Sequence, residues 1–242
     1  MVEPLVLLPG MMCDSRLFAP QLEKLSPDMT LLVAPVTGGD RIEEIASNLL
    51  DTLPHKFALA GVSMGGIVAM EILRRAPERV TRIALMDTNS LSETPQTAAD
   101  YEPLITKLKA GLLEQAVANI IRPEHLAPGP DRTAILHLVG RMAENIGSAA
   151  ITRQARALQR RRDYQATLRK CRLPALVLCG VHDTLTPVKR HEFMAELIPY
   201  AQLVLVQDAG HLPTLESPDA VTDALRAWMK QPLVLQKRIV AE

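Results

Sequence analysis

The sequence predicts an α/β fold with a mostly parallel central sheet, helices on both faces of that sheet and a helical cap insertion. Three observations predict it. Short apolar runs alternate with helical patterns at both ends of the chain. These runs lack the polar–apolar alternation of half-exposed strands, which is typical of strands buried on both faces of a parallel sheet. Between residues 89 and 172 the alternation stops, and only helical patterns remain.

The predicted elements follow one another as right-handed parallel crossovers require. The apolar runs predicted as strands cover residues 5–8, 31–34, 57–62, 82–86, 175–179 and 202–206. Helical patterns between them cover 16–25, 40–50, 67–76, 187–197 and 218–229, and those of the insertion cover 100–113, 114–121, 133–146 and 148–158. We therefore expect a core of residues 1–88 and 173–231, a helical cap of residues 89–172 and a C-terminal tail of residues 232–242.

Composition and charge limit the classes of partner. A chain of 242 residues suits one α/β domain with an insertion. Its 27 basic and 27 acidic residues give a net charge of zero, which argues against a nucleic-acid partner. Three cysteines without C-x-x-C spacing favour reduced thiols. The N-terminus lacks a signal-peptide pattern, and no apolar run approaches the roughly 18 residues of a membrane span. We expect a cytoplasmic protein with no membrane partner; the sequence leaves its oligomeric state open.

The segment Gly61-Val62-Ser63-Met64-Gly65 separates the third predicted strand from a helical pattern. A G-x-S-x-G motif in this context predicts a sharp turn that holds the serine hydroxyl above the sheet. Glycine on both sides of the serine lets the backbone pass close to its neighbours. The motif is short, so a structural turn with an unused serine is the alternative.

A serine nucleophile needs an adjacent base and a group that orients the base. Asp183 follows the fifth predicted strand and His211 follows the sixth. In a parallel sheet both then lie at the same carboxyl edge as Ser63. One class of serine hydrolases has this order of serine, acid and histidine. We predict that these three residues form a catalytic triad. The alternatives in similar loops are the acids Asp87 and Asp208 and the histidine His182.

Acyl transfer also needs two preorganised N–H donors for the oxyanion. The backbone N–H of Met64, directly after the serine, is the first predicted donor. The second is expected from the loop after the first strand, where Gly10 lets the chain turn and Met11 follows it. Met12 is the alternative second donor.

A substrate pocket is predicted between the serine turn and the helical insertion. Methionine, whose unbranched side chain adapts to many shapes, is plentiful there. Met12 and Met142 are expected to line the pocket, with plain packing as the alternative for Met142. Five arginines stand late in the insertion, namely Arg153, Arg156, Arg160, Arg161 and Arg162. A solvated helix face is their simpler interpretation, and one inward arginine that pairs with a substrate carboxylate is the sharper hypothesis.

Together these motifs resemble those of the α/β-hydrolase superfamily, in its short bacterial branch. That branch includes carboxylesterases, pimeloyl-ester carboxylesterases, enol-lactonases and carbon–carbon bond hydrolases. The resemblance covers nearly the whole chain and implies the α/β-hydrolase fold. The family usually has His-Gly after the first strand, where this chain has Pro9-Gly10. Haloalkane dehalogenases and epoxide hydrolases carry aspartate where this chain has Ser63, which argues against both activities.

The sequence therefore predicts a serine hydrolase that cleaves small carboxylic esters or thioesters through an acyl-enzyme. We expect no metal or cofactor, and a small-molecule acyl substrate as the partner. The alternatives are a carbon–carbon bond hydrolase or enol-lactonase, an acyltransferase, and a ligand-binding receptor or scaffold with a nearly silent triad. The fold hosts many chemistries and specificity lies in the cap, so the sequence does not name the substrate.

Overall fold

A computed structural model describes residues 3–233, and one six-stranded sheet lies at its centre. Neighbouring strands all run parallel, in the order β2-β1-β3-β4-β5-β6. The strands are β1 (Leu5–Leu8), β2 (Leu31–Val33), β3 (Phe57–Val62), β4 (Val80–Met86), β5 (Ala175–Gly180) and β6 (Ala201–Val206). The predicted parallel sheet is confirmed, because each predicted run coincides with one of these strands.

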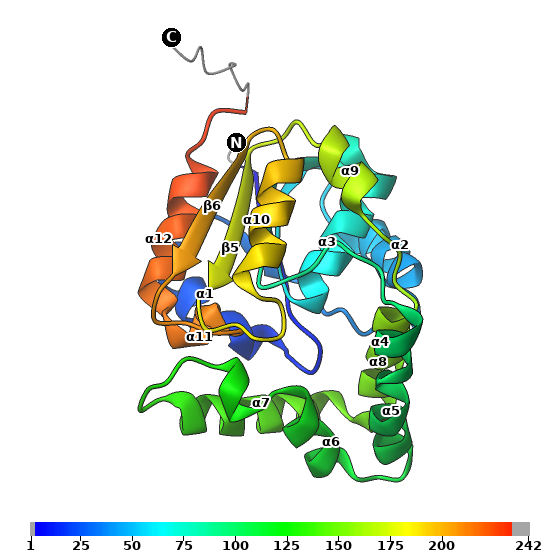
Figure 1. Cartoon of the computed structure of the whole chain (residues 1–242). Coiled ribbons are helices and arrows are strands. Elements are labelled where there is room, and N and C mark those ends of the chain that lie inside the picture. Colours follow the sequence, from blue (N-terminus) through cyan, green and yellow to red (C-terminus); the bar gives the residue numbers. More distant parts are fainter. Residues whose placement is uncertain (1–2, 234–242) are drawn as a thin grey trace.

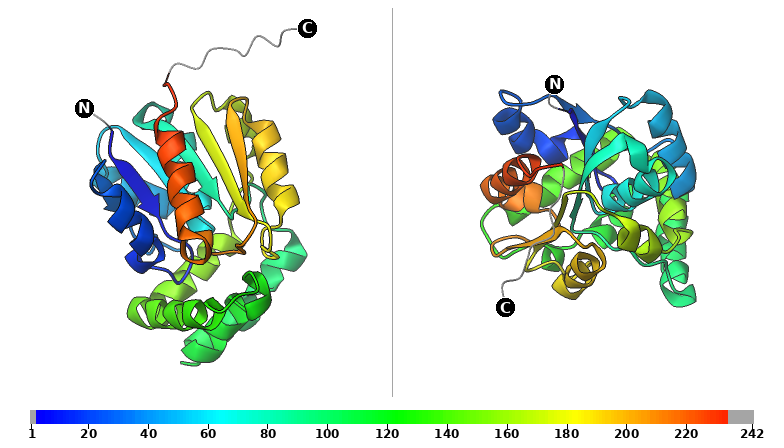
Figure 2. Two further views of the ribbon diagram at one scale, coloured as in Figure 1. Left: turned by 90° about the vertical axis from the view of Figure 1, so that its left-hand side faces the viewer. Right: turned by 90° about the horizontal axis from the view of Figure 1, so that it is seen from above.

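Helices cover both faces of the sheet, as predicted. On one face α1 (Ala19–Leu25) packs against α12 (Pro218–Met229), and on the other α2 (Ile42–Thr52) packs against α3 (Met64–Arg75) (Figure 2). Beside α3, α10 (Val188–Leu197) packs on β5 and β6. Every residue of β1, β3 and β5 is buried, which explains why these runs are apolar without alternation.

The segment between β4 and β5 forms a helical layer across the carboxyl ends of the strands (Figure 1). Its helices are α4 (Pro95–Ala99), α5 (Tyr101–Lys109), α6 (Leu113–Ile120), α7 (Arg132–Ile146) and α8 (Ser148–Gln159). One further helix, α9 (Gln165–Lys170), packs against α3 and α10 beside the sheet. The exact limits of the cap stay a prediction, and we propose that it ends before α9. The predicted tail, 232–242, lies almost entirely outside the described residues.

The topology directs the loops after β1, β3, β5 and β6 toward the cap, since all six strands point the same way (Figure 1). The space between sheet and cap is therefore where functional side chains can gather. A short one-turn helix, α11 (Pro213–Glu216), follows the loop after β6 and contacts α7 of the cap. Within residues 3–233 no helix is long and apolar enough to cross a membrane.

Candidate active site

Ser63 stands in the turn between β3 and α3, and crowded backbone fixes its conformation. Its φ of 53° is rare for a residue other than glycine, so the surrounding contacts must hold it. The Ser63 N–H donates to the Met86 carbonyl at 2.9 Å. A Cβ on Gly65 would lie 2.1 Å from the carbonyl oxygen of Leu8, so only glycine fits there. This packing holds the Ser63 side chain at the carboxyl edge of the sheet.

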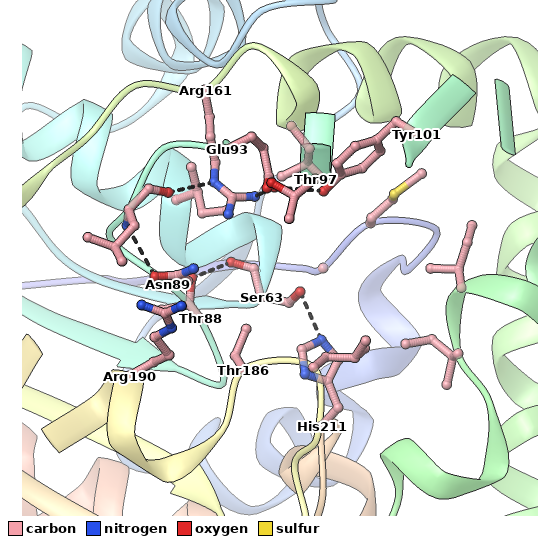
Figure 3. A pocket seen from close by; sticks show the side chains of 18 of the residues that line it. Ser63, Thr88, Asn89, Glu93, Thr97, Tyr101, Arg161, Thr186, Arg190 and His211 are labelled. Atoms are coloured by element: carbon pink, nitrogen blue, oxygen red, sulfur yellow. Dashed lines mark hydrogen bonds and ion pairs between the residues drawn. The ribbon is translucent and has the colours of Figure 1, made fainter. Parts of the chain in front are cut away.

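The Ser63 hydroxyl begins a series of hydrogen bonds that runs through His211 to Asp183. Ser63 Oγ and His211 Nε2 are 3.0 Å apart, and His211 Nδ1 and Asp183 Oδ2 are 2.8 Å apart. Figure 3 shows the imidazole of His211 turned toward Ser63. His211 and Asp183 are each only 3% exposed, so water competes little for these bonds. The structure thus brings together the three residues that the sequence singled out; their catalytic roles stay a prediction.

The Asp183 carboxylate is ionised despite its burial. Burial alone would raise its pKa, but the charge and hydrogen bond of His211 outweigh that effect, with help from Thr186. The Thr186 hydroxyl donates to Oδ2 at 2.5 Å, and the N–H groups of Leu185 and Thr186 donate to Oδ1 at 2.8 and 3.0 Å. The pKa of Asp183 therefore lies well below its usual range. A fixed negative charge next to His211 Nδ1 favours the tautomer whose Nε2 can accept the Ser63 proton.

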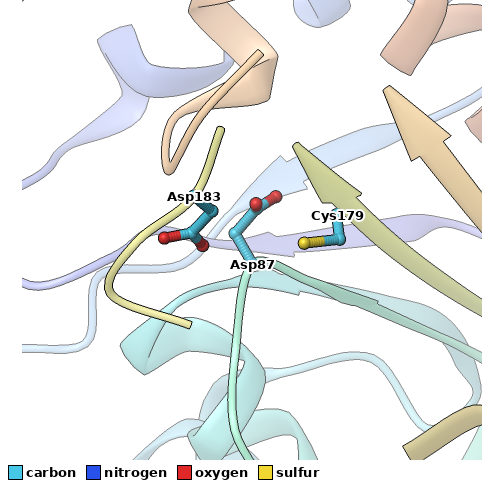
Figure 4. A group of neighbouring side chains, drawn as sticks. All are labelled: Asp87, Cys179 and Asp183. Atoms are coloured by element: carbon cyan, nitrogen blue, oxygen red, sulfur yellow. The ribbon is translucent and has the colours of Figure 1, made fainter. Parts of the chain in front are cut away.

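The alternative acids and base lie in other surroundings. Asp208 and His182 are exposed. Asp87 is fully buried beside Asp183 (Figure 4), and burial, followed by the charge of Asp183, raises its pKa well above the usual range. One Asp87 oxygen accepts the Gly180 N–H at 2.9 Å, and the other has no hydrogen-bond partner among the described residues. The charged form of Asp87 is therefore disfavoured, and His211 Nδ1 bonds to Asp183 instead.

Asp87, Cys179 and Asp183 form the one group of metal-ligand side chains found within residues 3–233. One ligand atom from each lies within 4.8 Å of the others (Figure 4). Burial raises the pKa values of the Cys179 thiol and of the Asp87 carboxyl group, whereas metal ions bind deprotonated ligands. Both oxygens of Asp183 already accept hydrogen bonds. The protonated forms that burial favours at two of the three residues therefore fit a metal ion poorly.

The predicted oxyanion donors lie on either side of Ser63. Met64 is the first residue of α3, where a backbone N–H has no partner within the helix. The Met12 N–H donates to the side-chain oxygen of Gln154 at 3.1 Å, which occupies it. The Met11 N–H has no backbone acceptor in the described part of the chain. This difference favours Met11 over Met12 as second donor, and both donor assignments stay predictions.

A cavity of about 450 Å³ opens beside Ser63 and His211, between the sheet and the cap. Its walls combine apolar side chains of the core and of the cap with a smaller polar group. The apolar lining includes Met11, Ile67, Leu104, Ile120, Ile121, Leu158 and Leu212. Such a volume suits a small ligand, and the mainly apolar walls suit an acyl chain.

The cavity corrects the prediction that Met12 and Met142 line the pocket. Neither methionine lies in the lining, and both are fully buried in the hydrophobic core. The backbone of Met12 adopts a φ of 64°, and its N–H is tied to Gln154 of α8, so this residue joins the cap to the core. The side chains of Met12 and Met142 therefore pack in the core. Met11 is the methionine that lines the cavity.

Comparison with known proteins assigns the chain to a family. A family model described as alpha/beta hydrolase fold matches residues 38–218. The chain belongs to this family. The match includes Ser63, Asp183 and His211, although it does not itself assign their roles. Family membership confirms the α/β-hydrolase fold that the motifs implied.

Individual relatives of this α/β hydrolase carry several names. The pimeloyl-(acyl-carrier protein) methyl ester esterase of Aromatoleum aromaticum is 28% identical over 75% of this chain and 77% of its own. The 3-oxoadipate enol-lactonase 2 of Acinetobacter baylyi is 21% identical over 80% of this chain and 73% of its own. Among solved structures, a thermophilic esterase from Thermogutta terrifontis has a TM-score of 0.84 and 26% identity, covering 94% of this chain and 89% of its own.

The cavity of this α/β hydrolase also contains an ion pair. The sequence predicts one of its members, an inward arginine, but not the acidic partner. Arg161, one of the five arginines, lines the cavity, where its Nη1 lies 2.5 Å from Glu93 Oε1 (Figure 3). The Tyr101 hydroxyl donates to the same Glu93 oxygen at 3.2 Å. The Arg161 and Glu93 side chains are only 9% and 11% exposed, so the pair is nearly desolvated. No local pattern indicates Glu93, because 67 residues without a motif separate it from Arg161.

The other four arginines bind protein groups elsewhere. Arg156 pairs with Glu102, Arg160 with Asp40 and Arg162 with Glu43, while Arg153 donates to the Thr37 carbonyl. Of these partners, Asp40, Glu43 and Thr37 belong to the segment between β2 and the middle of α2. These arginines therefore attach the end of α8 to the core and to α5. Of the five arginines, Arg161 is therefore the one that points into the cavity, as the hypothesis of an inward arginine requires.

A second set of hydrogen bonds, through Thr88 and His191, holds the backbone of the serine turn. The Thr88 hydroxyl donates to the Ser63 carbonyl at 2.7 Å, and the Thr88 N–H donates to His191 Nε2 at 3.0 Å. Burial lowers the pKa of His191 to about 4, so this histidine is neutral and can accept at Nε2. No motif in the sequence marks His191, because a histidine on a helix carries no local signature.

The cap contacts the backbone of the histidine loop directly. The His211 N–H donates to the carbonyl of His125, which lies in the connection between α6 and α7, at 2.8 Å. Glu216 accepts the N–H groups of Gly210, Leu212 and Ala127 at 2.9, 2.8 and 2.7 Å. One carboxylate thus joins both neighbours of His211 to the cap.

Proposed function

We propose that this α/β hydrolase is a serine hydrolase that cleaves small carboxylic esters or thioesters. The observation that carries the proposal is the series of hydrogen bonds from Ser63 Oγ through His211 to an ionised Asp183, placed beside a cavity of about 450 Å³. Relatives named as an ester esterase and an enol-lactonase support ester cleavage, since a lactone is a cyclic ester.

The geometry suits a two-step acyl transfer. His211 Nε2 takes the proton of Ser63 as Oγ attacks the ester carbonyl carbon, and Asp183 stabilises the resulting imidazolium. The N–H groups of Met64 and Met11 receive the oxyanion, each contributing about 3–4 kcal/mol in comparable sites. His211 then gives the proton to the leaving alcohol or thiol. Finally, His211 removes a proton from water, which attacks the acyl-enzyme and restores Ser63.

Labelling with a fluorophosphonate probe tests the nucleophile. The probe reacts with an activated serine, so mass spectrometry should find it on Ser63. Ser92 also lines the cavity and should remain unlabelled in the same sample. Chromogenic esters of increasing acyl length should be hydrolysed, and Ser63→Ala should abolish both labelling and turnover. Folded protein that neither takes the label nor hydrolyses any ester would contradict the proposal and favour a ligand-binding role.

A further inference from the structure

The charged side chains in the cavity do not balance. Three of them line it, namely Glu93, Arg161 and Arg190. Glu93 and Arg161 form the ion pair described above, so their charges cancel locally. Arg190 remains as a single positive charge in a cavity whose other walls are apolar or neutral. Because the mechanism proposed for Ser63 does not use this charge, it calls for another explanation.

No acidic side chain within residues 3–233 pairs with the positive charge of Arg190. It belongs to the first turn of α10, next to Lys189, and the positive end of a helix dipole disfavours cations there. Within residues 3–233 its guanidinium forms neither an ion pair nor a side-chain hydrogen bond, and no dashed line reaches it in Figure 3. The side chain is exposed, which places it at the mouth of the cavity.

A second donor lies on the same side of the cavity. In Figure 3 the Asn89 amide and the Arg190 guanidinium are drawn next to each other beside Thr88, and both residues line the cavity. Asn89 Oδ1 accepts the Leu91 N–H at 3.1 Å, which fixes the amide and leaves its NH₂ group as a donor. A guanidinium and an amide NH₂ that line one cavity offer only donors, which suits an anion with several acceptor oxygens.

We propose that Arg190, with Asn89, binds a carboxylate on the substrate, so that the preferred substrates are esters with a free carboxylate elsewhere in the molecule. This inference rests on the proposed function and narrows its substrate class. Arg161 cannot serve in this way without giving up Glu93, whereas Arg190 loses no partner. The planar fork of Arg190 matches the two oxygens of a carboxylate.

The test compares p-nitrophenyl esters of equal chain length that end in either a methyl group or a carboxylate. A series of lengths is used, because the distance from Ser63 to Arg190 selects the best match. The wild-type ratio of kcat/KM, carboxylate ester over methyl ester, should fall about three- to tenfold in Arg190→Gln, mainly through KM. Arg190→Lys should lie between the two, since it keeps the charge and loses the fork. Raising the salt concentration should lower the ratio in the wild type.

Lys189→Gln is the matched control, since Lys189 is an exposed cation of the same turn that does not line the cavity. Its ratio should equal that of the wild type. An equal fall in both variants would point to a long-range field and overturn the proposal, as would an unchanged ratio in Arg190→Gln.

A binding measurement separates this inference from the proposed function. Ser63→Ala protein should bind the carboxylate ester more tightly than the methyl ester, and Arg190→Gln in that background should remove the difference. This outcome would support the carboxylate site even if no ester were turned over. Equal binding of the two esters to Ser63→Ala protein would overturn it, whatever the catalytic result.

Discussion

The sheet and the cap face the same cavity but hold their side chains in different ways. On the sheet side, Ser63, Asp183 and His211 sit in tight turns whose backbone groups are hydrogen-bonded to neighbouring strands and loops. On the cap side, amphipathic helices contribute apolar side chains, and many of their residues are half-buried or exposed. The core can therefore hold the reactive side chains in place while the cap varies the shape of the cavity.

The glycines of the sheet side and of the cap also differ in how closely other atoms surround them. Four glycines of the sheet side stand so close to other backbone that a Cβ would overlap it, namely Gly61, Gly65, Gly180 and Gly210. Those of the cap have nothing within 4 Å of an added Cβ, namely Gly111, Gly129, Gly140 and Gly147. These four positions on the sheet side therefore tolerate no added volume. In the cap there is space at all four glycines, but the positive φ of Gly111 and Gly147 still favours glycine there, which leaves Gly140 of α7 as the helical position that can accept a methyl group.

The largest effect is expected from the acid beside His211. Asp183→Asn should lower kcat by about 10⁴-fold, because the amide supports the wrong histidine tautomer. Asp87→Asn, directly after β4, is the matched control, and it should keep kcat within about tenfold, since His211 bonds to Asp183 and an amide oxygen at position 87 can still accept from Gly180. Steady-state kinetics decide between them. A loss as large in Asp87→Asn would assign the triad acid to Asp87.

A pair of alanine variants sharpens the contrast in packing. Gly65→Ala should destabilise the fold by about 3 kcal/mol or more, because the methyl group overlaps the Leu8 carbonyl. Gly140→Ala, in the middle of α7, should stabilise it by about 0.5–1 kcal/mol through helix propensity. Urea unfolding measures both. Similar destabilisation by the two substitutions would refute the distinction between a crowded core and a tolerant cap.

Acid should weaken the network behind the serine turn. The pKa of His191 is lowered by burial from about 6.5 to about 4, so only the unfolded chain takes up this proton between those values. Stability is therefore complete above about pH 6.5 and falls as the pH falls toward 4, by at most about 3 kcal/mol. Burial lowers the pKa of His125 as well, which adds to the loss.

His191→Gln isolates this contribution, because a glutamine oxygen can accept from Thr88 without titrating. The difference in unfolding free energy between pH 7 and pH 4.5 should be smaller in this variant than in the wild type. His137→Gln, at an exposed position of α7, should leave that difference unchanged. An identical pH dependence in all three proteins would show that His191 is not the group that titrates.

A smaller effect is expected where the cap meets the histidine loop. Glu216→Gln loses the charge that three N–H groups share, and kcat should fall about tenfold because His211 is less well held. Stability should fall by about 1–2 kcal/mol. Glu144→Gln, on the exposed face of α7, is the control and should change neither quantity. Unaltered kcat in Glu216→Gln would mean that the cap does not position His211.

Local patterns in the amino-acid sequence are enough to predict the sheet, its helices and the residues around Ser63. Apolar runs buried on both faces predict parallel strands, and parallel strands bring the loops with Ser63, Asp183 and His211 to one edge. These inferences succeed because each depends on local pattern and on the common direction of the strands. Glycine beside Ser63 is predictable for the same reason, since the sharp turn itself requires it.

The surroundings of that site depend on tertiary contacts between the cap and the sheet. The ion pair of Arg161 with Glu93, the packing of Met12 and Met142 in the core, and the place of Arg190 at the cavity mouth, without a partner in the described part of the chain, depend on how the cap rests on the sheet. Helical periodicity says which face of a helix is apolar, but it does not say which surface that face meets. Side chains far apart in the chain become neighbours only through that contact, so no local pattern could reveal them.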